Sequence, residues 1–259
     1  MNWNTVWVER LGEIAIVRMS REKSLNAFDR ELTEELTDVG LRFHRDHDTH
    51  AVILTGSARA FSAGADLKEE RPPMTFAEQR ERSHLGRHLC RAWEEMPQTT
   101  IAAIEGLAVG AGCAIAISCD WRVIAEDAYL YVPEVKIGIN LQWQAIPRLV
   151  ALVGPARAKR IVMLCEKMGA RQALDWGLVE EIAASGGAVD KAMELARAAC
   201  AMPPVIMTMT KQAINATANA NLHASSYMDS DVALLVRDSD EARQIREDFR
   251  SKGKAERKG

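Results

Sequence analysis

Residues 99–120, TTIAAIEGLAVGAGCAIAISCD, constrain the fold of this chain more than any other stretch. Residues 101–105 are nearly all apolar and predict a short buried strand. A turn with three glycines follows, and residues 113–119 predict a buried helix of small and apolar side chains. Glycine lets another group approach the main chain, and the first N–H groups of a helix lack partners. The turn is therefore a candidate for an oxyanion hole, in which backbone donors face a developing negative charge.

Two other interpretations fit this stretch taken alone. Residues 101–119 are apolar over a length that suits a membrane span, but Glu105 and the central glycines argue against one. Tight packing without any site is the second alternative. Further stretches of the chain are needed to decide between packing and a site.

Composition limits the classes of protein to consider. A chain of 259 residues suits one large domain, or one domain with an appendage. A formal charge of −3 argues against a nucleic-acid-binding surface. The N-terminal residues lack the basic and apolar regions of a signal peptide, and the five cysteines lack paired spacing. We therefore expect a cytoplasmic protein with reduced thiols, and no membrane partner.

The order of elements predicts an α/β fold with a helical C-terminal region, because strands and helices alternate first and helices alone follow. We expect a core over residues 1–195 and a helical oligomerisation region over 196–259, since residues 222–236 are apolar enough to face a partner. The expected strands are residues 5–9, 14–19, 50–55, 101–105, 121–125, 129–132 and 179–182. The expected helices are residues 31–44, 75–93, 113–119, 142–153, 156–164, 170–176, 189–200, 205–217 and 222–248.

Two more stretches favour a site over simple packing. Residues 59–69, RAFSAGADLKE, form a second loop of small residues that follows a buried strand. Two such loops can aim two backbone N–H groups at one atom. Glu134, in the sequence YVPE, follows another buried strand and is held by the proline before it. A positioned carboxylate beside two such donors can move a proton next to a polarised carbonyl.

In this order and spacing, the three stretches resemble the crotonase superfamily, the enoyl-CoA hydratase/isomerase family. Its motifs AFxAGADLKE, NGxAxGGGxELAxxCD and PE correspond to residues 60–69, 105–120 and 133–134, and REKSLNAF at residues 21–28 is similar to its RPKALNAL. The resemblance implies a spiral of ββα units and a helical trimerisation region. It also implies acyl-CoA substrates, homotrimers or dimers of trimers, and no metal or cofactor apart from the CoA of the substrate.

Carried over position by position, the resemblance assigns the two oxyanion N–H groups to Ala65 and Ala111. It assigns the acid/base role to Glu134. Small side chains in the first loop would line the track of the CoA adenine and pantetheine. The binding residues implied in this way are Ala63, Ala65, Asp66, Leu67, Lys68 and Ala111.

The chain departs from the family's pattern at Ala114, where hydratases have the first of two glutamates that activate water. One carboxylate, Glu134, remains. This favours enoyl-CoA double-bond isomerisation, in which one carboxylate moves a proton. Alternatives are hydration, hydrolysis or C–C cleavage of an unusual acyl group, and CoA binding with little catalysis.

A second departure follows Glu134. The family's GxxPGxGGxxRL reads GINLQWQAIPRL at residues 138–149, so that Leu, Gln, Gln and Ala replace the proline and glycines around Trp143. The resemblance places this segment beside the acyl pocket. Gln142, Trp143 and Gln144 are therefore candidates to shape that pocket, although they could equally face the core or a neighbouring subunit.

The histidines do not predict a metal site. His44, His47 and His50 recur every third residue, which distributes them around a helix rather than converging them on an ion. His84 and His88 lie one turn apart, a spacing that fits a solvated or pocket-lining pair better than a zinc site. Asp120 is expected to serve the structure at a helix end.

Overall fold

The computed structural model describes residues 3–70, 72–237 and 239–255. Its main sheet has six strands in the order β1-β2-β3-β4-β6-β9, with β1 antiparallel to β2 and all other neighbours parallel. A smaller sheet has the order β5-β7-β8. The strands of the main sheet are β1 (Val6–Leu11), β2 (Ile14–Met19), β3 (Ala51–Thr55), β4 (Thr99–Ile104), β6 (Trp121–Ala125) and β9 (Glu181–Ala183). Those of the smaller sheet are β5 (Leu107–Val109), β7 (Tyr129–Tyr131) and β8 (Met168–Gly169).

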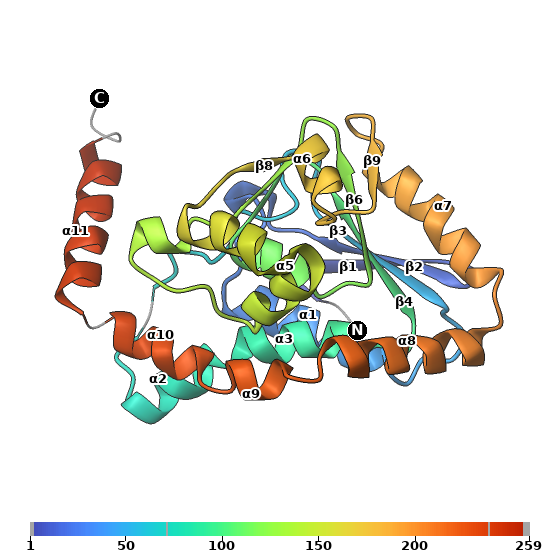
Figure 1. Cartoon of the computed structure of the whole chain (residues 1–259), viewed down its shortest axis with the longest axis horizontal. Coiled ribbons are helices and arrows are strands. Elements are labelled where there is room, and N and C mark those ends of the chain that lie inside the picture. Colours follow the sequence, from blue (N-terminus) through green and yellow to red (C-terminus); the bar gives the residue numbers. More distant parts are fainter. Residues whose placement is uncertain (1–2, 71, 238, 256–259) are drawn as a thin grey trace.

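Helices cover both faces of the main sheet (Figure 1). The first seven are α1 (Arg30–Phe43), α2 (Phe76–Ser83), α3 (Leu85–Glu94), α4 (Ala111–Ala116), α5 (Ala145–Met163), α6 (Ala170–Asp175) and α7 (Ala188–Cys200). The C-terminal helices are α8 (Pro204–Ala218), α9 (Leu222–Ser226), α10 (Asp229–Arg237) and α11 (Asp240–Ala255). This arrangement confirms the α/β fold and the helical C-terminal region.

Side-chain alternation along the central strands builds two apolar cores. On β3, Val52 and Leu54 face a large core that includes side chains of α1, α3 and α4. Ile53 points to the opposite face and packs against Ala192 and Ala196 of α7. Because both faces are covered, the strand is a continuous apolar run, as expected of a central parallel strand.

Several predicted boundaries were wrong. Residues 107–109, expected within a turn, form strand β5, which pairs in parallel with β7. The helix expected over 113–119 begins at Ala111 and ends at Ala116. The helix expected over 75–93 is divided at His84 into α2 and α3. The two helices expected between residues 142 and 164 form α5, with a non-helical Gly154 between them.

The C-terminal region packs on the core through polar contacts and is not one long helix. Residues 222–248, expected as a single helix, are divided among α9, α10 and α11. Lys211 of α8 donates to the Asp120 carboxylate at 2.6 Å, and the N–H of Thr100 donates to the same oxygen at 2.7 Å. Asp120 therefore serves the structure, as predicted. The proposed division at residue 195 lies within α7, and residues 256–259 lie outside the described part.

Glu105, for which the sequence suggested no role, holds the start of α7. Its buried carboxylate accepts the N–H groups of Gly186 at 3.1 Å and Ala188 at 2.8 Å. Ala188 is the first residue of α7, so the carboxylate satisfies donors that the helix itself leaves unpaired.

We expect Glu105→Ala to destabilise the fold, because it leaves two buried N–H groups without acceptors. The loss is about 2 kcal/mol, the usual penalty for unsatisfied buried donors. Glu105→Gln keeps an acceptor oxygen and should lose less. Urea unfolding measures both; equal free energies of unfolding for Glu105→Ala and the parent protein would show that the carboxylate does not support α7.

Candidate active site

The two small-residue loops run side by side. Ser62 and Ala108 form a parallel bridge. The N–H of Ser62 donates to Leu107 O at 3.0 Å, and the N–H of Val109 donates to Ser62 O at 2.9 Å. Beyond this bridge Gly64 has a φ of +91°, and a Cβ there would lie 2.8 Å from Val109 O. Glycine is therefore required for the close approach of the first loop to the second.

The first candidate donor is the N–H of Ala65. The residues on either side of it bond to Phe28: the N–H of Phe28 donates to Gly64 O at 2.7 Å, and the N–H of Asp66 donates to Phe28 O at 2.9 Å. In such a parallel pair, the N–H of the intervening residue points away from its neighbour. Ala65 is exposed, and its N–H makes no hydrogen bond within the part of the chain described.

The second candidate donor is the N–H of Ala111, the first residue of α4. The N–H of Ala114 donates to Gly110 O at 3.0 Å and closes the first turn, whereas the N–H of Ala111 bonds to no described residue. A Cβ built on Gly64 would lie 3.7 Å from the nitrogen of Ala111, so the second donor borders the first loop. The fold thus brings both loops and their free N–H groups together.

The Glu134 carboxylate lies next to the second donor. A Cβ on Gly110, which has a φ of +50°, would lie 2.4 Å from Glu134 Oε1. Only 8% of Glu134 is exposed, and its buried Oε2 has no hydrogen-bond partner among the described residues. Burial raises the pKa of Glu134 to about 7, against a smaller opposing effect of its main-chain hydrogen bond. A carboxyl group with such a pKa can both accept and donate a proton near neutral pH.

Ala114 contributes a methyl group, not a carboxylate, to the surroundings of this site. It is buried on α4 and borders a small cavity beside β7, the strand that precedes Glu134. The side chains around this cavity are mostly aliphatic. They belong to Cys113, Ala114, Ile117, Leu130, Tyr131, Val132, Leu141, Ala145, Leu149, Ile161 and Leu178.

The residues expected along the CoA track form a partly exposed strip. Ala63 and Asp66 are half-buried, and Leu67 and Lys68 are exposed. Asp66 accepts the N–H of Lys68 at 3.0 Å and pairs with the Arg21 guanidinium at 3.2 Å. The strip is therefore anchored at Asp66 while its neighbours face solvent.

The segment after Glu134 divides between two environments. Trp143 is half-buried and meets the Phe28 ring edge-on, with 5.3 Å between ring centroids. Gln144 is buried, and its Nε2 donates to Ser226 Oγ at 3.1 Å. Gln144 thus faces the C-terminal helices, whereas Gln142 stays half-buried. Leu141 and Ala145, which sequence reasoning did not single out, line the cavity instead.

Sequence reasoning also missed the residue that supports the first loop. Asn26 is fully buried with a φ of +54°. Its Oδ1 accepts the N–H of Arg21 at 2.8 Å, its Nδ2 donates to Ala60 O at 3.1 Å, and its carbonyl accepts Ser62 Oγ at 2.8 Å. The available signal was an asparagine in a polar loop, since asparagine tolerates the left-handed conformation.

The ring centroids of His84 and His88 lie 6.3 Å apart, but no group of three candidate metal ligands among the described residues contains two histidines. His50 instead lies beside Glu13 and Cys200, whose ligand atoms fall within 4.8 Å of one another. His50 Nδ1 is 3.2 Å from a carboxylate oxygen of Glu13, whose side chain is exposed. The absence of a metal site stays a prediction. Among the described helices, none is both long and apolar enough for a membrane crossing.

Comparisons with known proteins point to one family. The family model for enoyl-CoA hydratase/isomerase matches residues 9–259. The short-chain-enoyl-CoA hydratase of Clostridium acetobutylicum is 36% identical over 216 residues, covering 83% of this chain and 82% of the relative. A probable enoyl-CoA hydratase of Mycobacterium tuberculosis is 32% identical over 225 residues, covering 86% and 85%.

Solved structures show the same fold. An enoyl-CoA hydratase from Bacillus anthracis superposes with a TM-score of 0.79 at 30% identity, covering 93% of this chain and 90% of that one. An enoyl-CoA hydratase from Mycobacterium avium subsp. paratuberculosis gives a TM-score of 0.86 at 24% identity over 97% of both chains, a likeness of fold alone. With its paired loops, buried carboxylate and near-complete family match, the chain belongs to the enoyl-CoA hydratase/isomerase family of acyl-CoA-processing enzymes.

Proposed function

We propose that this enzyme moves the double bond of an enoyl-CoA thioester, with Glu134 as the sole acid/base. The supporting observation is that one buried carboxylate, whose Oε2 has no described partner, lies against Gly110 at the start of the second loop, while Ala114 occupies the position of the first hydratase glutamate. A lone carboxylate suffices for proton transfer. The hydratases of the family, by contrast, use two carboxylates to activate water.

The proposed reaction conserves every atom of the substrate. The ionised Glu134 removes a proton from the carbon between the carbonyl and a β,γ double bond. The electron pair delocalises onto the thioester oxygen, to which the N–H groups of Ala65 and Ala111 donate hydrogen bonds; each such donor is worth about 3 kcal/mol in the transition state. Protonated Glu134 then returns the proton to the γ carbon, which leaves an α,β double bond. Neither water nor an electron acceptor is consumed.

We further propose that the exposed strip of the first loop binds CoA through main-chain groups, with Ala63, Asp66, Leu67 and Lys68 along the track. Trp143, and Gln142 beside it, would border the acyl group. Because the side chains around Ala114 are mostly aliphatic, an acyl group that lies against them would be a hydrocarbon. No cofactor is needed beyond the CoA of the substrate.

Hydration is the second candidate, since the relatives at 36% and 32% identity carry the name of hydratases. Incubation of the enzyme with straight-chain 2-enoyl-CoA and 3-enoyl-CoA esters separates the reactions by mass and absorbance. We expect interconversion without a mass change. Added water would show a hydratase, free CoA a hydrolase, a shortened acyl chain a C–C lyase, and binding without turnover a CoA-binding protein; each of these would replace the isomerase proposal.

Ala114→Glu tests the missing carboxylate directly. We expect the substitution to raise the hydration rate of a 2-enoyl-CoA by about tenfold or more, because general acid–base catalysis contributes at least that much. Ala114→Gln is the matched control, with the same size and no acid group, and should not gain hydration. Equal hydration rates for both variants would show that the residue at position 114 does not decide the reaction.

The pKa of Glu134 predicts a pH dependence with a definite sign. Because the base must be ionised, kcat/KM should rise with pH around a midpoint near 7, where burial has raised the pKa of Glu134. Burial favours the neutral form, so the stability that Glu134 contributes below pH 4.5 is lost as pH rises through about 7. Glu134→Gln should therefore be inactive, yet more stable than the parent above pH 8, by about 3 kcal/mol at most.

Denaturant unfolding at pH 5 and pH 9 measures this difference. A Glu134→Gln variant without any relative gain at pH 9 would contradict a buried carboxylate, and retained turnover would remove Glu134 from the mechanism.

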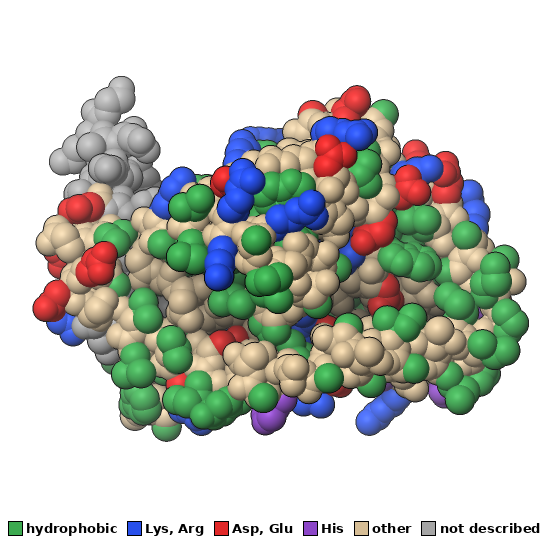
Figure 2. All heavy atoms as spheres, in the orientation of Figure 1, with side chains coloured by type: hydrophobic (Ala, Val, Ile, Leu, Met, Phe, Trp, Pro, Cys, Tyr) green, Lys and Arg blue, Asp and Glu red, His purple; other side chains and the backbone are tan. Residues whose placement is uncertain are grey.

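We also propose that α8 forms a contact between subunits in a homotrimer or a dimer of trimers. The chain exposes hydrophobic side chains along this helix, at the lower edge of Figure 2. They include Ile206 and Met209, which are 62% and 64% exposed. Ile206→Asp should lower the mass measured by sedimentation, whereas Thr217→Asp at the end of α8 should change it less. A monomeric parent protein would contradict this assembly.

A further inference from the structure

The turn that leads into α5 holds two consecutive side-chain-bearing residues in a left-handed conformation. Trp143 has a φ of +64° and Gln144 a φ of +57°. This region is unfavourable for residues with a Cβ, and it persists where surrounding contacts determine it. At the position of Gln144 the family's pattern has glycine, which adopts this conformation freely. Contacts with other parts of this chain must therefore stabilise the left-handed conformation, which glycine would adopt without support.

Part of that support comes from the C-terminal helices. The main-chain N–H of Gln144 donates to Asp229 Oδ2 at 2.8 Å, at the first residue of α10. Its side-chain Nε2 donates to Ser226 Oγ in α9 at 3.1 Å. These partners lie more than eighty residues further along the chain. A hydrogen bond from a main-chain N–H to a carboxylate is among the stronger kinds.

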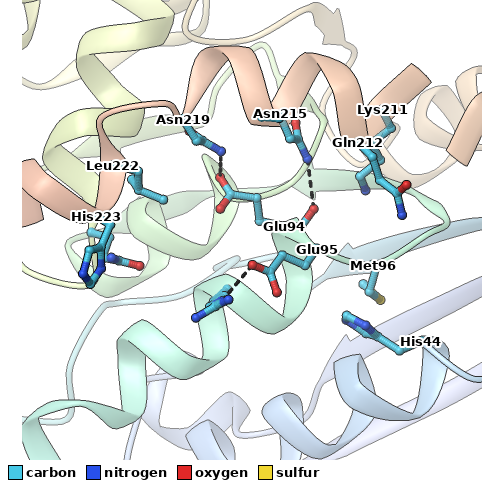
Figure 3. Close-up of a pocket in the computed structure, with 13 residues that line it drawn as sticks. His44, Glu94, Glu95, Met96, Lys211, Gln212, Asn215, Asn219, Leu222 and His223 are labelled. Carbon is cyan, nitrogen blue, oxygen red and sulfur yellow. Dashed lines mark hydrogen bonds and ion pairs between the residues drawn. The ribbon is translucent and has the colours of Figure 1, made fainter. Parts of the chain in front are cut away.

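The carbonyl side of the turn is held as firmly. Arg148 Nη1 donates to Trp143 O and to Gln144 O, each at 3.0 Å. The guanidinium is itself fixed by two bonds of 2.7 Å to the Glu94 carboxylate. Asn219 donates to the same carboxylate at 3.0 Å, and the close-up in Figure 3 shows it reaching Glu94 from the helix above.

The turn decides where the Trp143 indole lies. The ring covers Gly86 of α3, where a Cβ would come within 1.9 Å of Trp143 Cε2. It also meets Phe28, whose main chain bonds to both neighbours of Ala65. The residues on either side of the turn, Leu141 and Ala145, line the cavity that Ala114 borders. The conformation of this one turn therefore positions both the Trp143 ring and the cavity-lining side chains beside the candidate site.

We propose that Asp229 is a positioning residue for the acyl group: through the N–H of Gln144 it holds the left-handed turn that places Trp143 and Leu141. The inference rests on the proposed acyl-CoA function, and it assigns α10 an effect on the acyl part of the ligand. In the proposed function the loop at residues 63–68 binds the CoA part, and the hydrogen bonds of the Asp229 carboxylate go to Gln144 and Ser230, not to that loop. Loss of Asp229 should therefore weaken acyl binding selectively.

The experiment compares two carboxylates of α10. Asp229→Ala should raise KM for an enoyl-CoA about tenfold, the equivalent of one lost hydrogen bond to a charged group, with a smaller change in kcat. The dissociation constant of free CoA should change less than about twofold. Asp231→Ala is the matched control, because Asp231 pairs with Arg80 at 2.6 Å on the outer side and should leave KM unchanged. Asp229→Asn keeps an acceptor and should behave nearly as the parent protein.

Two further measurements separate positioning from a general loss of structure. Amide hydrogen exchange at Gln144 should speed up in Asp229→Ala and not in Asp231→Ala. Adding Gln144→Gly to Asp229→Ala should restore part of the KM, because glycine needs no support at a positive φ. Equal KM changes in the two alanine variants, or no rescue by Gln144→Gly, would overturn the positioning role.

The outcomes also distinguish this inference from the proposed reaction. If the parent protein binds enoyl-CoA more tightly than CoA but does not move the double bond, the isomerase proposal fails, and a selective loss of that affinity in Asp229→Ala still supports the inference. If isomerisation proceeds and Asp229→Ala leaves KM unchanged, the inference fails and the isomerase proposal stands. A parent protein that binds CoA and enoyl-CoA equally would overturn the inference as well.

Discussion

The rest of the site depends on one carboxylate kept out of water. Glu134 is 92% shielded, its Oε1 occupies the space that a Cβ at residue 110 would need, and no described cation forms an ion pair with it. Such a charge is costly to bury, which is why its pKa rises to about 7. The glycine at 110 serves this arrangement, because a residue with a Cβ there would collide with the carboxyl group.

How far the sequence predicts this fold depends on the length and uniformity of each segment. The run at Ala51–Thr55 is long and apolar enough to identify a buried parallel strand. Leu107–Val109 is three residues inside a glycine-rich turn, and its pairing with β7 arises from contacts that no local pattern encodes. Likewise, no glycine or proline marks the break before Asp229; the N–H of Gln144 meets the carboxylate at that point.

The candidate site also has features that the sequence could predict and features that it could not. The resemblance to the family's motifs assigned the donor role to Ala65 and Ala111, and that role stays a prediction; the two loops of small residues around them could be recognised in the sequence. The contacts that support the first loop could not be predicted, because Asn26 bonds to Ala60 and Ser62, which lie more than thirty residues away in sequence. The left-handed Gln144 was beyond prediction for a different reason, since a glutamine gives no local sign of a positive φ and its partners come from the C-terminal helices.

The two departures from the family's pattern, thirty residues apart in sequence, concern one cavity. Ala114 borders it from α4, and Leu141 and Ala145 border it from the rebuilt turn. A water molecule held there would need two or more polar partners, and the aliphatic side chains supply none. The changes therefore act together: the first removes a carboxylate that could hold water, and the second surrounds the same space with hydrocarbon. With an apolar lining beside Ala114 and Glu134 as the remaining carboxylate, proton transfer between carbons of the substrate needs less from this site than activation of water, which is the physical reason to favour isomerisation over hydration.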